Sequence, residues 1–243
     1  MQASGNTPRR QPGWRHLVIM TGAAGRYHWN YMLIITIKQG KEKSLLEGQP
    51  WIYASAIDKV EGKPQEKMKP GSTAIVQSSA KKFLARAAYN SKSQIRARVW
   101  SFDENEPVDH ALIKRRVKAA LHKRAASLKK AGANQLLALV KGEEDGLPGL
   151  LVDLFGGADG YLICQFQAGG VDAWKVAIVQ ALMAETGCRN VYERCDPLIR
   201  KGEGLPVISG ALAGEDPPDD VILTENGVRF TLDLKTGDKS KFR

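Results

Sequence analysis

The stretch Ile95-Arg96-Ala97-Arg98-Val99-Trp100 alternates apolar and basic side chains one residue at a time. Successive side chains of a β-strand point to opposite faces of a sheet. The pattern therefore predicts a strand that buries its apolar members and directs Arg96 and Arg98 together toward solvent. Because a guanidinium group suits bidentate contact with phosphate, these two arginines are the first candidates for a polyanion-binding surface.

The region around this strand, residues 33–102, has the pattern of a β-rich unit. Turn residues at Gly62-Lys63-Pro64, Pro70-Gly71 and Asn90-Ser91 separate short runs rich in β-branched, aromatic or alternating residues. Strands at this spacing favour a small barrel. The other predicted strands of this unit are Leu33–Ile37, Thr73–Gln77 and Phe83–Tyr89.

Residues 107–131 have the pattern of a long helix, with Pro107 placed for the first turn and Gly132 for the stop. Apolar residues repeat at near-helical spacing along one stripe, and most of the remaining surface is Lys or Arg. No acidic residue lies between positions 110 and 142. A solvated face is the ordinary explanation of such a run, but the lack of i,i+4 acidic partners favours an electrostatic track for a polyanion.

Residues 136–234 have an α/β pattern. A helix-like stretch over 171–185 lies between strand-like runs, and Asn226-Gly227 suits a tight primed turn between the two strands of a hairpin. The predicted strands are Leu136–Val140, Leu150–Leu154, Tyr161–Phe166, Asn190–Glu193, Val221–Thr224 and Val228–Leu234.

Composition indicates a globular protein with a basic balance. The chain has 243 residues, 36 Lys and Arg against 26 Asp and Glu, and a net charge of +10, which favours nucleic acid as a partner. Its longest apolar runs are too short to span a bilayer. Cys164, Cys188 and Cys195 form no zinc or disulfide pattern, so a reducing, cytoplasmic location is expected.

Residues 1–31 differ from the rest of the chain: they are Arg-containing, acid-free and rich in Pro and Gly. We expect a disordered leader translated from a misplaced start, with the folded part beginning at Met32. An organelle transit peptide is the alternative.

The chain contains no glycine-rich phosphate loop and no nucleophile elbow. The acidic run Glu143-Glu144-Asp145 could serve acid–base chemistry or hold a metal, but a turn before a strand is the simpler interpretation. Basic and aromatic residues of the first unit form a stronger set, since they combine charge with rings that stack on bases, although Trp51 could instead be core. The predicted RNA-binding residues are Lys41, Lys43, Trp51, Tyr53, Arg96 and Arg98, with no catalytic, cofactor-binding or metal-binding residue.

Residues 38–102, with Gln49-Pro-Trp-Ile-Tyr53, resemble the PUA domain of large-subunit ribosomal RNA (cytosine-5-)-methyltransferases, and Gly142–Asp153 resembles the central module of that family. Glu225–Asp233 resembles the hairpin that leads into its catalytic domain. The resemblance implies methyl transfer from S-adenosylmethionine to C5 of a cytosine. The expected partners are ribosomal RNA and, as an alternative to a monomer, a second copy, with no membrane.

The family's Leu-Asp-Gln-Arg motif does not follow Gly237-Asp-Lys-Ser-Lys-Phe242, and its cofactor glycines and catalytic cysteine motif have no match. We therefore expect a truncated, inactive chain that binds no S-adenosylmethionine. The expected fold class is α+β: a PUA-like pseudo-barrel, then a small α/β domain, with a Rossmann-like domain absent. The expected boundaries are 1–31 leader, 32–104 PUA-like domain, 105–220 central domain and 221–243 hairpin.

Two alternatives from other classes stay open. One is an enzyme complete in itself that uses Glu143, Glu144 or Asp153. The other is a non-catalytic module that binds RNA or a partner protein.

Overall fold

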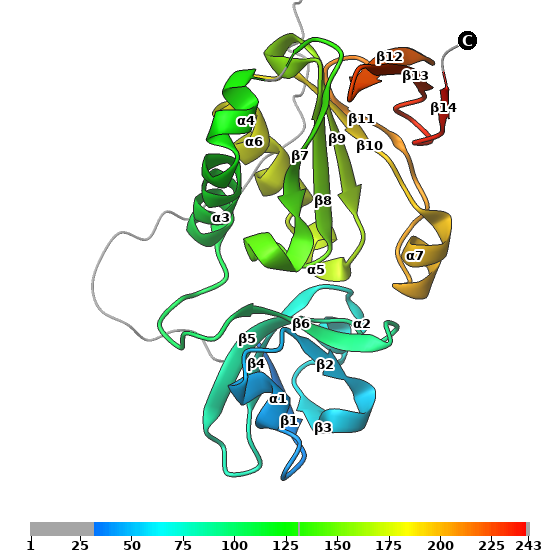
Figure 1. Cartoon of the computed structure of the whole chain (residues 1–243). Coiled ribbons are helices and arrows are strands. Elements are labelled where there is room, and N and C mark those ends of the chain that lie inside the picture. The colour runs from blue at the N-terminus through cyan, green and yellow to red at the C-terminus, as the bar shows by residue number, and fades with distance from the viewer. Residues whose placement is uncertain (1–31, 131, 242–243) are drawn as a thin grey trace, which may run out of the picture.

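A computed structural model describes residues 32–130 and 132–241, so the leader expected at 1–31 lies outside the described residues. These residues form two units, each built on its own sheet, and a small hairpin sheet that packs on the second unit (Figure 1). Among the described residues, no helix is long and apolar enough to cross a membrane.

The first unit is a six-stranded sheet with strand order β2-β6-β5-β4-β1-β3, in which only the β1–β4 pair is parallel. Its core takes the apolar side of each strand, so Ala97 and Val99 are buried while Arg96 and Arg98 are only half-buried, as the alternation predicts. The elements are β1 (Leu33–Ile37), α1 (Lys43–Leu46), β2 (Trp51–Tyr53), β3 (Ile57–Glu61), α2 (Pro64–Met68), β4 (Ser72–Gln77), β5 (Phe83–Tyr89) and β6 (Ile95–Ser101).

The second unit is a five-stranded sheet with order β11-β10-β9-β8-β7. The helices α3, α4 and α6 lie on one side of this sheet (Figure 1), and the buried residues of α3 and α6 join its main core. The elements are α3 (His110–Lys123), α4 (Ala125–Lys130), β7 (Leu136–Lys141), β8 (Leu150–Phe155), β9 (Tyr161–Phe166), α5 (Gly169–Ala173), α6 (Lys175–Thr186), β10 (Asn190–Glu193), α7 (Pro197–Gly202) and β11 (Gly210–Ala213).

The long helix predicted over 107–131 begins later and is broken. Asp109 caps α3, since its Oδ1 accepts a hydrogen bond from the backbone N–H of Leu112 at 2.8 Å. The helix is interrupted at Arg124, whose backbone leaves the helical region (φ −111°, ψ 13°). The chain therefore forms two helices, α3 and α4, where the apolar stripe predicted one.

The hairpin consists of β12 (Val221–Glu225) and β13 (Val228–Leu232), with β14 (Lys239–Lys241) added along β13. Asn226 and Gly227 both have positive φ, 49° and 77°, which confirms the predicted primed turn. Leu223 and Leu232 pack on Phe155 of the second sheet, so the hairpin covers the face that α3 and α6 leave open.

The expected fold class, α+β with no Rossmann-like component, is wrong. In the second sheet β9 and β10 run parallel, and α5 and α6 connect them as a helical crossover. Parallel strands joined by helices are the repeating unit of α/β and Rossmann-like sheets. The hairpin and the helices together bury β9 from both faces, so its apolar residues run continuously and do not alternate. The described chain is a mixed α/β fold.

Candidate nucleic-acid interface

The structure brings four of the six predicted RNA-binding residues onto two neighbouring strands. Trp51 on β2 pairs with Arg98 on β6, and Tyr53 pairs with Ile95, beside Arg96. Both rings are exposed, Trp51 to 40%, so the alternative that Trp51 is a core residue is wrong. Lys41 and Lys43 lie exposed just before and at the start of α1, the short helix that precedes β2.

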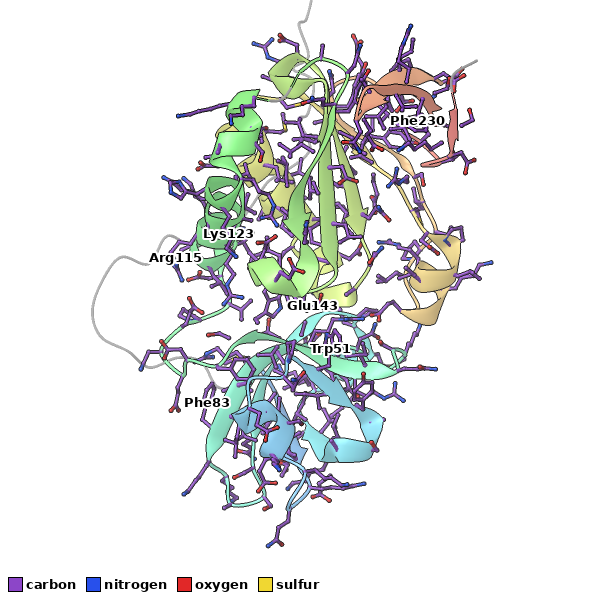
Figure 2. The ribbon with its side chains drawn as sticks, in the orientation of Figure 1. Trp51, Phe83, Arg115, Lys123, Glu143 and Phe230 are labelled. Atoms are coloured by element: carbon purple, nitrogen blue, oxygen red, sulfur yellow. The ribbon has the colours of Figure 1, made fainter. Side chains whose placement is uncertain are left out.

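Arg98 contacts the second unit rather than open solvent. Its Nη1 lies 3.1 Å from Oε1 of Glu143 and its Nη2 lies 3.3 Å from Oε1 of Glu203. The indole Nε1 of Trp51 donates to the same Oε1 of Glu143 at 3.0 Å. Figure 2 shows Trp51 and Glu143 facing each other across the boundary between the two units. Arg98 therefore links the units as well as being a candidate for phosphate contact.

Arg96 also has a protein partner, since its Nη1 donates to the carbonyl oxygen of Ser91 in the β5–β6 turn. The expectation that both guanidinium groups project freely from one wet face is therefore not what the structure shows. Contact of Arg96 and Arg98 with RNA remains a prediction, in which phosphate would share or replace these protein acceptors.

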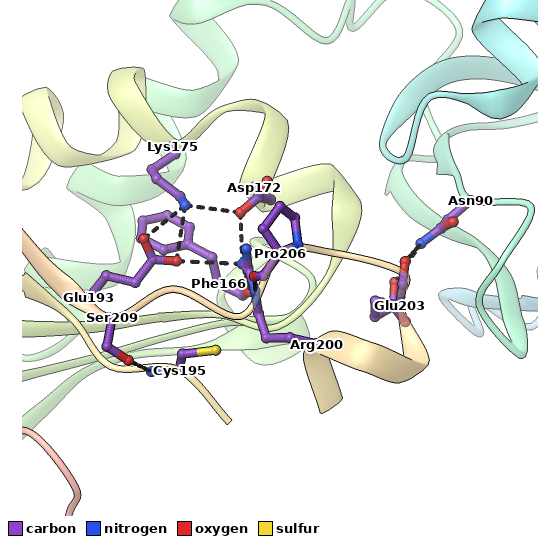
Figure 3. A network of polar contacts seen from close by, with 10 residues as sticks. All are labelled: Asn90, Phe166, Asp172, Lys175, Glu193, Cys195, Arg200, Glu203, Pro206 and Ser209. Carbon is purple, nitrogen blue, oxygen red and sulfur yellow. Dashed lines mark hydrogen bonds and ion pairs between the residues drawn. The ribbon is translucent and has the colours of Figure 1, made fainter. Parts of the chain in front are cut away.

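Helix α7 holds the two units together from the other side of the boundary (Figure 3). Arg200, almost fully buried, donates to Asp172 at 2.7 Å and to the carbonyl oxygen of Phe166 at 2.8 Å, both in the second unit. Three residues later, Glu203 accepts from Asn90 and from Ser93 in the first unit. Local sequence gave no signal for this link, because its partners are more than 100 positions apart.

Several basic residues of α3, and Arg124 between α3 and α4, are paired with acids from outside these helices. Arg115 and Arg116 each lie 3.0 Å from a carboxylate oxygen of Glu106, and Lys123 and Arg124 contact Asp145. The remaining lysines are exposed and have no acidic partner within residues 32–130 and 132–241. We call this set the α3–α4 basic face: Lys114, Lys118, Lys129 and Lys130.

The three consecutive acids do not converge on a common point. Glu143 faces Trp51 and Arg98, Glu144 is exposed, and Asp145 is buried against Arg124. Burial raises the pKa of Asp145, but hydrogen bonds from Arg124, from the backbone of Lys141 and from Lys123 outweigh it, so the pKa is lowered. The turn predicted here is a 3₁₀ turn, Gly142–Asp145.

The remaining acid of the alternative enzyme, Asp153, lies apart from these three on β8. Burial raises its pKa, and the charge of Arg194 partly opposes this. Among the described residues, no group of three or more His, Cys, Asp or Glu side chains is arranged to hold a metal ion.

The turn between β9 and α5 is the position at which a Rossmann-like crossover presents its glycines to a cofactor. Gly169 and Gly170 stand there, but the first unit already fills the space. A Cβ at Gly169 would lie 2.8 Å from the backbone N of Gly71, and a Cβ at Gly170 would lie 2.7 Å from the Cβ of Ala88. The residues at this turn therefore do not fit S-adenosylmethionine.

Two of the three cysteines are poor thiolates. Burial raises the pKa of Cys164, with Glu193 and Asp153 adding to the shift, and burial also raises the pKa of Cys188. Because a thiolate is the attacking form of cysteine, neither residue suits nucleophilic catalysis.

Comparison with known sequences matches the first unit to a domain family and most of the chain to curated proteins. Residues 35–102 match the family model of a PUA-like domain. The ribosomal RNA large subunit methyltransferase I of Pseudoalteromonas translucida (strain TAC 125) is 40% identical over 208 residues, 86% of this chain and 50% of that protein. The protein of the same name from Aeromonas salmonicida (strain A449) is 39% identical over 210 residues, 86% of this chain and 51% of that protein. The chain spans about half the length of the curated relatives it matches.

Two solved structures share the fold. A SAM-dependent methyltransferase structure from Streptococcus mutans aligns with a TM-score of 0.67 at 15% identity, over 86% of this chain and 50% of that one. A methyltransferase complexed with SAH aligns with a TM-score of 0.66 over the same shares, also at 15% identity. The likeness supports the correction of the fold class to a mixed α/β fold shared with such methyltransferases.

Proposed function

From the similarity to ribosomal RNA large subunit methyltransferase I, we propose that residues 32–241 are the RNA-binding part of a ribosomal RNA methyltransferase. The PUA-like domain and the α3–α4 basic face together make the RNA contact. One observation carries the proposal. Four exposed lysines, which have no acidic partner among the described residues, lie on two consecutive helices of a chain whose first unit matches a PUA-like domain.

The physical basis is electrostatic. Exposed ammonium groups displace counterions from RNA, and this release raises the affinity of the protein for the RNA phosphate backbone. Phosphate contacts also set the register of the complex. Lys114 and Lys118 are four residues apart and so lie on one side of α3. Lys41 and Lys43 add charge near α1. The exposed rings of Trp51 and Tyr53 provide stacking surfaces.

The methyl-transfer reaction is part of the proposal for the whole protein, not for these residues. The proposed reaction moves a methyl group from S-adenosylmethionine to C5 of a cytosine in ribosomal RNA. Within the described residues, two cysteines are poor thiolates and the β9–α5 turn is filled by the first unit. We propose that the 243-residue chain alone binds RNA and transfers no methyl group. Its three free cysteines support a cytoplasmic setting.

The test is a binding titration of the full chain with fragments of large-subunit ribosomal RNA at a series of salt concentrations. We expect log K to fall linearly with log salt, with a slope of about −0.7 to −0.9 for each phosphate contact. Equal affinity for RNA and for a neutral polymer at low salt would overturn the RNA-binding function. Methyl transfer by the isolated chain would overturn the proposal that this chain binds RNA without transferring a methyl group.

A further inference from the structure

A pocket of about 430 Å³ lies at the boundary between the two units. Pro50, Trp100 and Phe102 line it from the first unit, and Arg116, Glu143 and Gly146 line it from the second. We propose that this pocket binds one unpaired RNA nucleotide whose base carries an amino group. The proposal rests on the RNA-binding function above and adds a site for a single base to it.

The carboxylate of Glu143 is held in place and keeps capacity to accept hydrogen bonds. Its Oε1 accepts from Trp51 and Arg98, at 3.0 and 3.1 Å, so the side chain is anchored and its negative charge is balanced. Its Oε2 accepts no hydrogen bond from the other described residues. An ionised carboxylate is acceptor-only, so the base edge that it recognises must donate N–H groups.

This requirement selects among the bases. Cytosine, adenine and guanine each present an amino group, and Glu or Asp accepting from N4 of cytosine is an established pairing. Uracil presents a single N–H between two carbonyl oxygens, which a carboxylate repels. The Oε2 of Glu143 offers no donor to a phosphate oxygen, so the Glu143 wall of the pocket suits the N–H groups of a base rather than the backbone.

Phe102 and Arg116 give the same pocket planar groups on which a base could stack. Phe102 is 43% exposed although it is a large apolar side chain, and its ring is free to stack. The guanidinium plane of Arg116 is fixed by hydrogen bonds to the carbonyl oxygen of Gly146 at 2.6 Å and to Glu106 at 3.0 Å. Unstacked RNA bases are bound on aromatic rings or arginine planes and read at their edges. The pocket combines both elements, and its volume lies within the range of small-ligand sites.

The experiment uses the full chain and three RNA hairpins that differ at one bulged position, which holds cytosine, uracil or an abasic residue. We expect the chain to bind the cytosine bulge about fivefold or more tighter than the abasic bulge, which is the lower end for one stacked base. The preference for cytosine over uracil measures the contribution of the Glu143 carboxylate separately from stacking, because the two pyrimidines have the same size.

Variants of the chain separate the contribution of stacking on Phe102 from that of hydrogen bonding to Glu143. Phe102→Ala should lower affinity for both base-containing bulges toward that for the abasic one. Glu143→Gln should abolish the preference for cytosine over uracil. Glu144→Gln is the matched control, since it removes the same charge from the neighbouring exposed residue and should keep both preferences. Leu198→Ala is the control for loss of an exposed apolar side chain outside the pocket.

The binding results either support or overturn the base pocket, and they test the RNA-binding function separately. Loss of the cytosine preference in Glu143→Gln but not in Glu144→Gln supports the proposal. Equal binding of all three hairpins by the wild-type chain, with strong salt dependence, overturns the base pocket and leaves the RNA-binding function standing. No binding of any hairpin at low salt overturns both. Wild-type preferences that survive in Phe102→Ala and Glu143→Gln also overturn the pocket.

Discussion

The side-chain amide of Asn90 donates to two acceptors of Glu203, to Oε2 at 2.9 Å and to the backbone carbonyl oxygen at 2.8 Å. The two residues are buried, come from different units and stand 113 positions apart. Ser93 and Arg98 donate to the other carboxylate oxygen of Glu203. One glutamate thus fixes how the PUA-like unit sits on the second unit, and with it the relative placement of the RNA-binding surfaces.

Removal of Glu203 should weaken this junction. In Glu203→Ala, Ser93 loses its buried acceptor, Asn90 keeps only the backbone carbonyl of residue 203, and the Arg98 charge loses one of its two carboxylates. We expect the free energy of unfolding to fall by about 3 kcal/mol, as for a broken buried pair. Urea denaturation measures the change. Glu215→Ala, at an exposed position, is the control, and equal stability of the two variants would show that the junction does not depend on Glu203.

The free energy of unfolding should also fall when a side chain is added where Gly71 packs closely against Gly169. Gly71 has φ +83°, and a Cβ there would lie 2.1 Å from the carbonyl oxygen of Gly169. Gly71→Ala should therefore lose about 1–2 kcal/mol to backbone strain and about 1–3 kcal/mol more to the clash.

Gly48→Ala is the matched control for Gly71→Ala. Gly48 has nearly the same φ, +82°, but nothing lies within 4 Å of its added Cβ. The difference in unfolding free energy between the two variants isolates the contact between the units. A difference near zero would contradict the packing described for Gly71 and Gly169.

The buried carboxylate of Asp145 should make stability depend on pH. Its folded-state pKa is lowered below its ordinary value of 3.8, because hydrogen bonds from Arg124, the Lys141 backbone and Lys123 outweigh the effect of burial. A lowered pKa contributes stability that is present above the unfolded-state pKa and lost as pH falls through the folded-state pKa. Thermal melts of wild type and Asp145→Asn should therefore differ at pH 7, begin to approach each other below about pH 4, and converge only below the folded-state pKa of Asp145. A gap that does not narrow as the pH falls below about 4 toward 2 would contradict this assignment.

Loss of charge from the α3–α4 basic face should weaken binding to all RNA sequences by a similar factor. Lys114→Ala with Lys118→Ala should flatten the salt slope by about 0.7–0.9 for each phosphate that the chain no longer neutralises. Lys59→Ala with Lys201→Ala removes the same charge at exposed positions elsewhere and should change the slope less. Filter-binding titrations measure both, and equal slopes for the two double variants would argue against a special role for this face.

Much of the fold follows from local pattern. The alternation at residues 95–100 determines which side of β6 is buried, because side chains of a strand alternate in direction. The positive φ of Asn226 and Gly227 follows from residue types that tolerate it. Shorter elements such as β2 and β11 were missed, since three or four residues carry too little periodicity.

The candidate site depended on contacts between distant residues. The sequence indicated that Arg98 and Trp51 were available for binding, but only the folded chain showed that Glu143 and Glu203 meet them. Nothing near Phe102 in the sequence marks it as a pocket residue, because four of the ten residues that line this pocket come from the second unit. The sequence by itself determined most of the longer strands, the hairpin turn and the basic composition, which depend on neighbours along the chain. Which charges are paired, which glycines are covered and where a pocket opens were decided by the packing of the two units, because those partners lie from tens of positions to 113 positions apart.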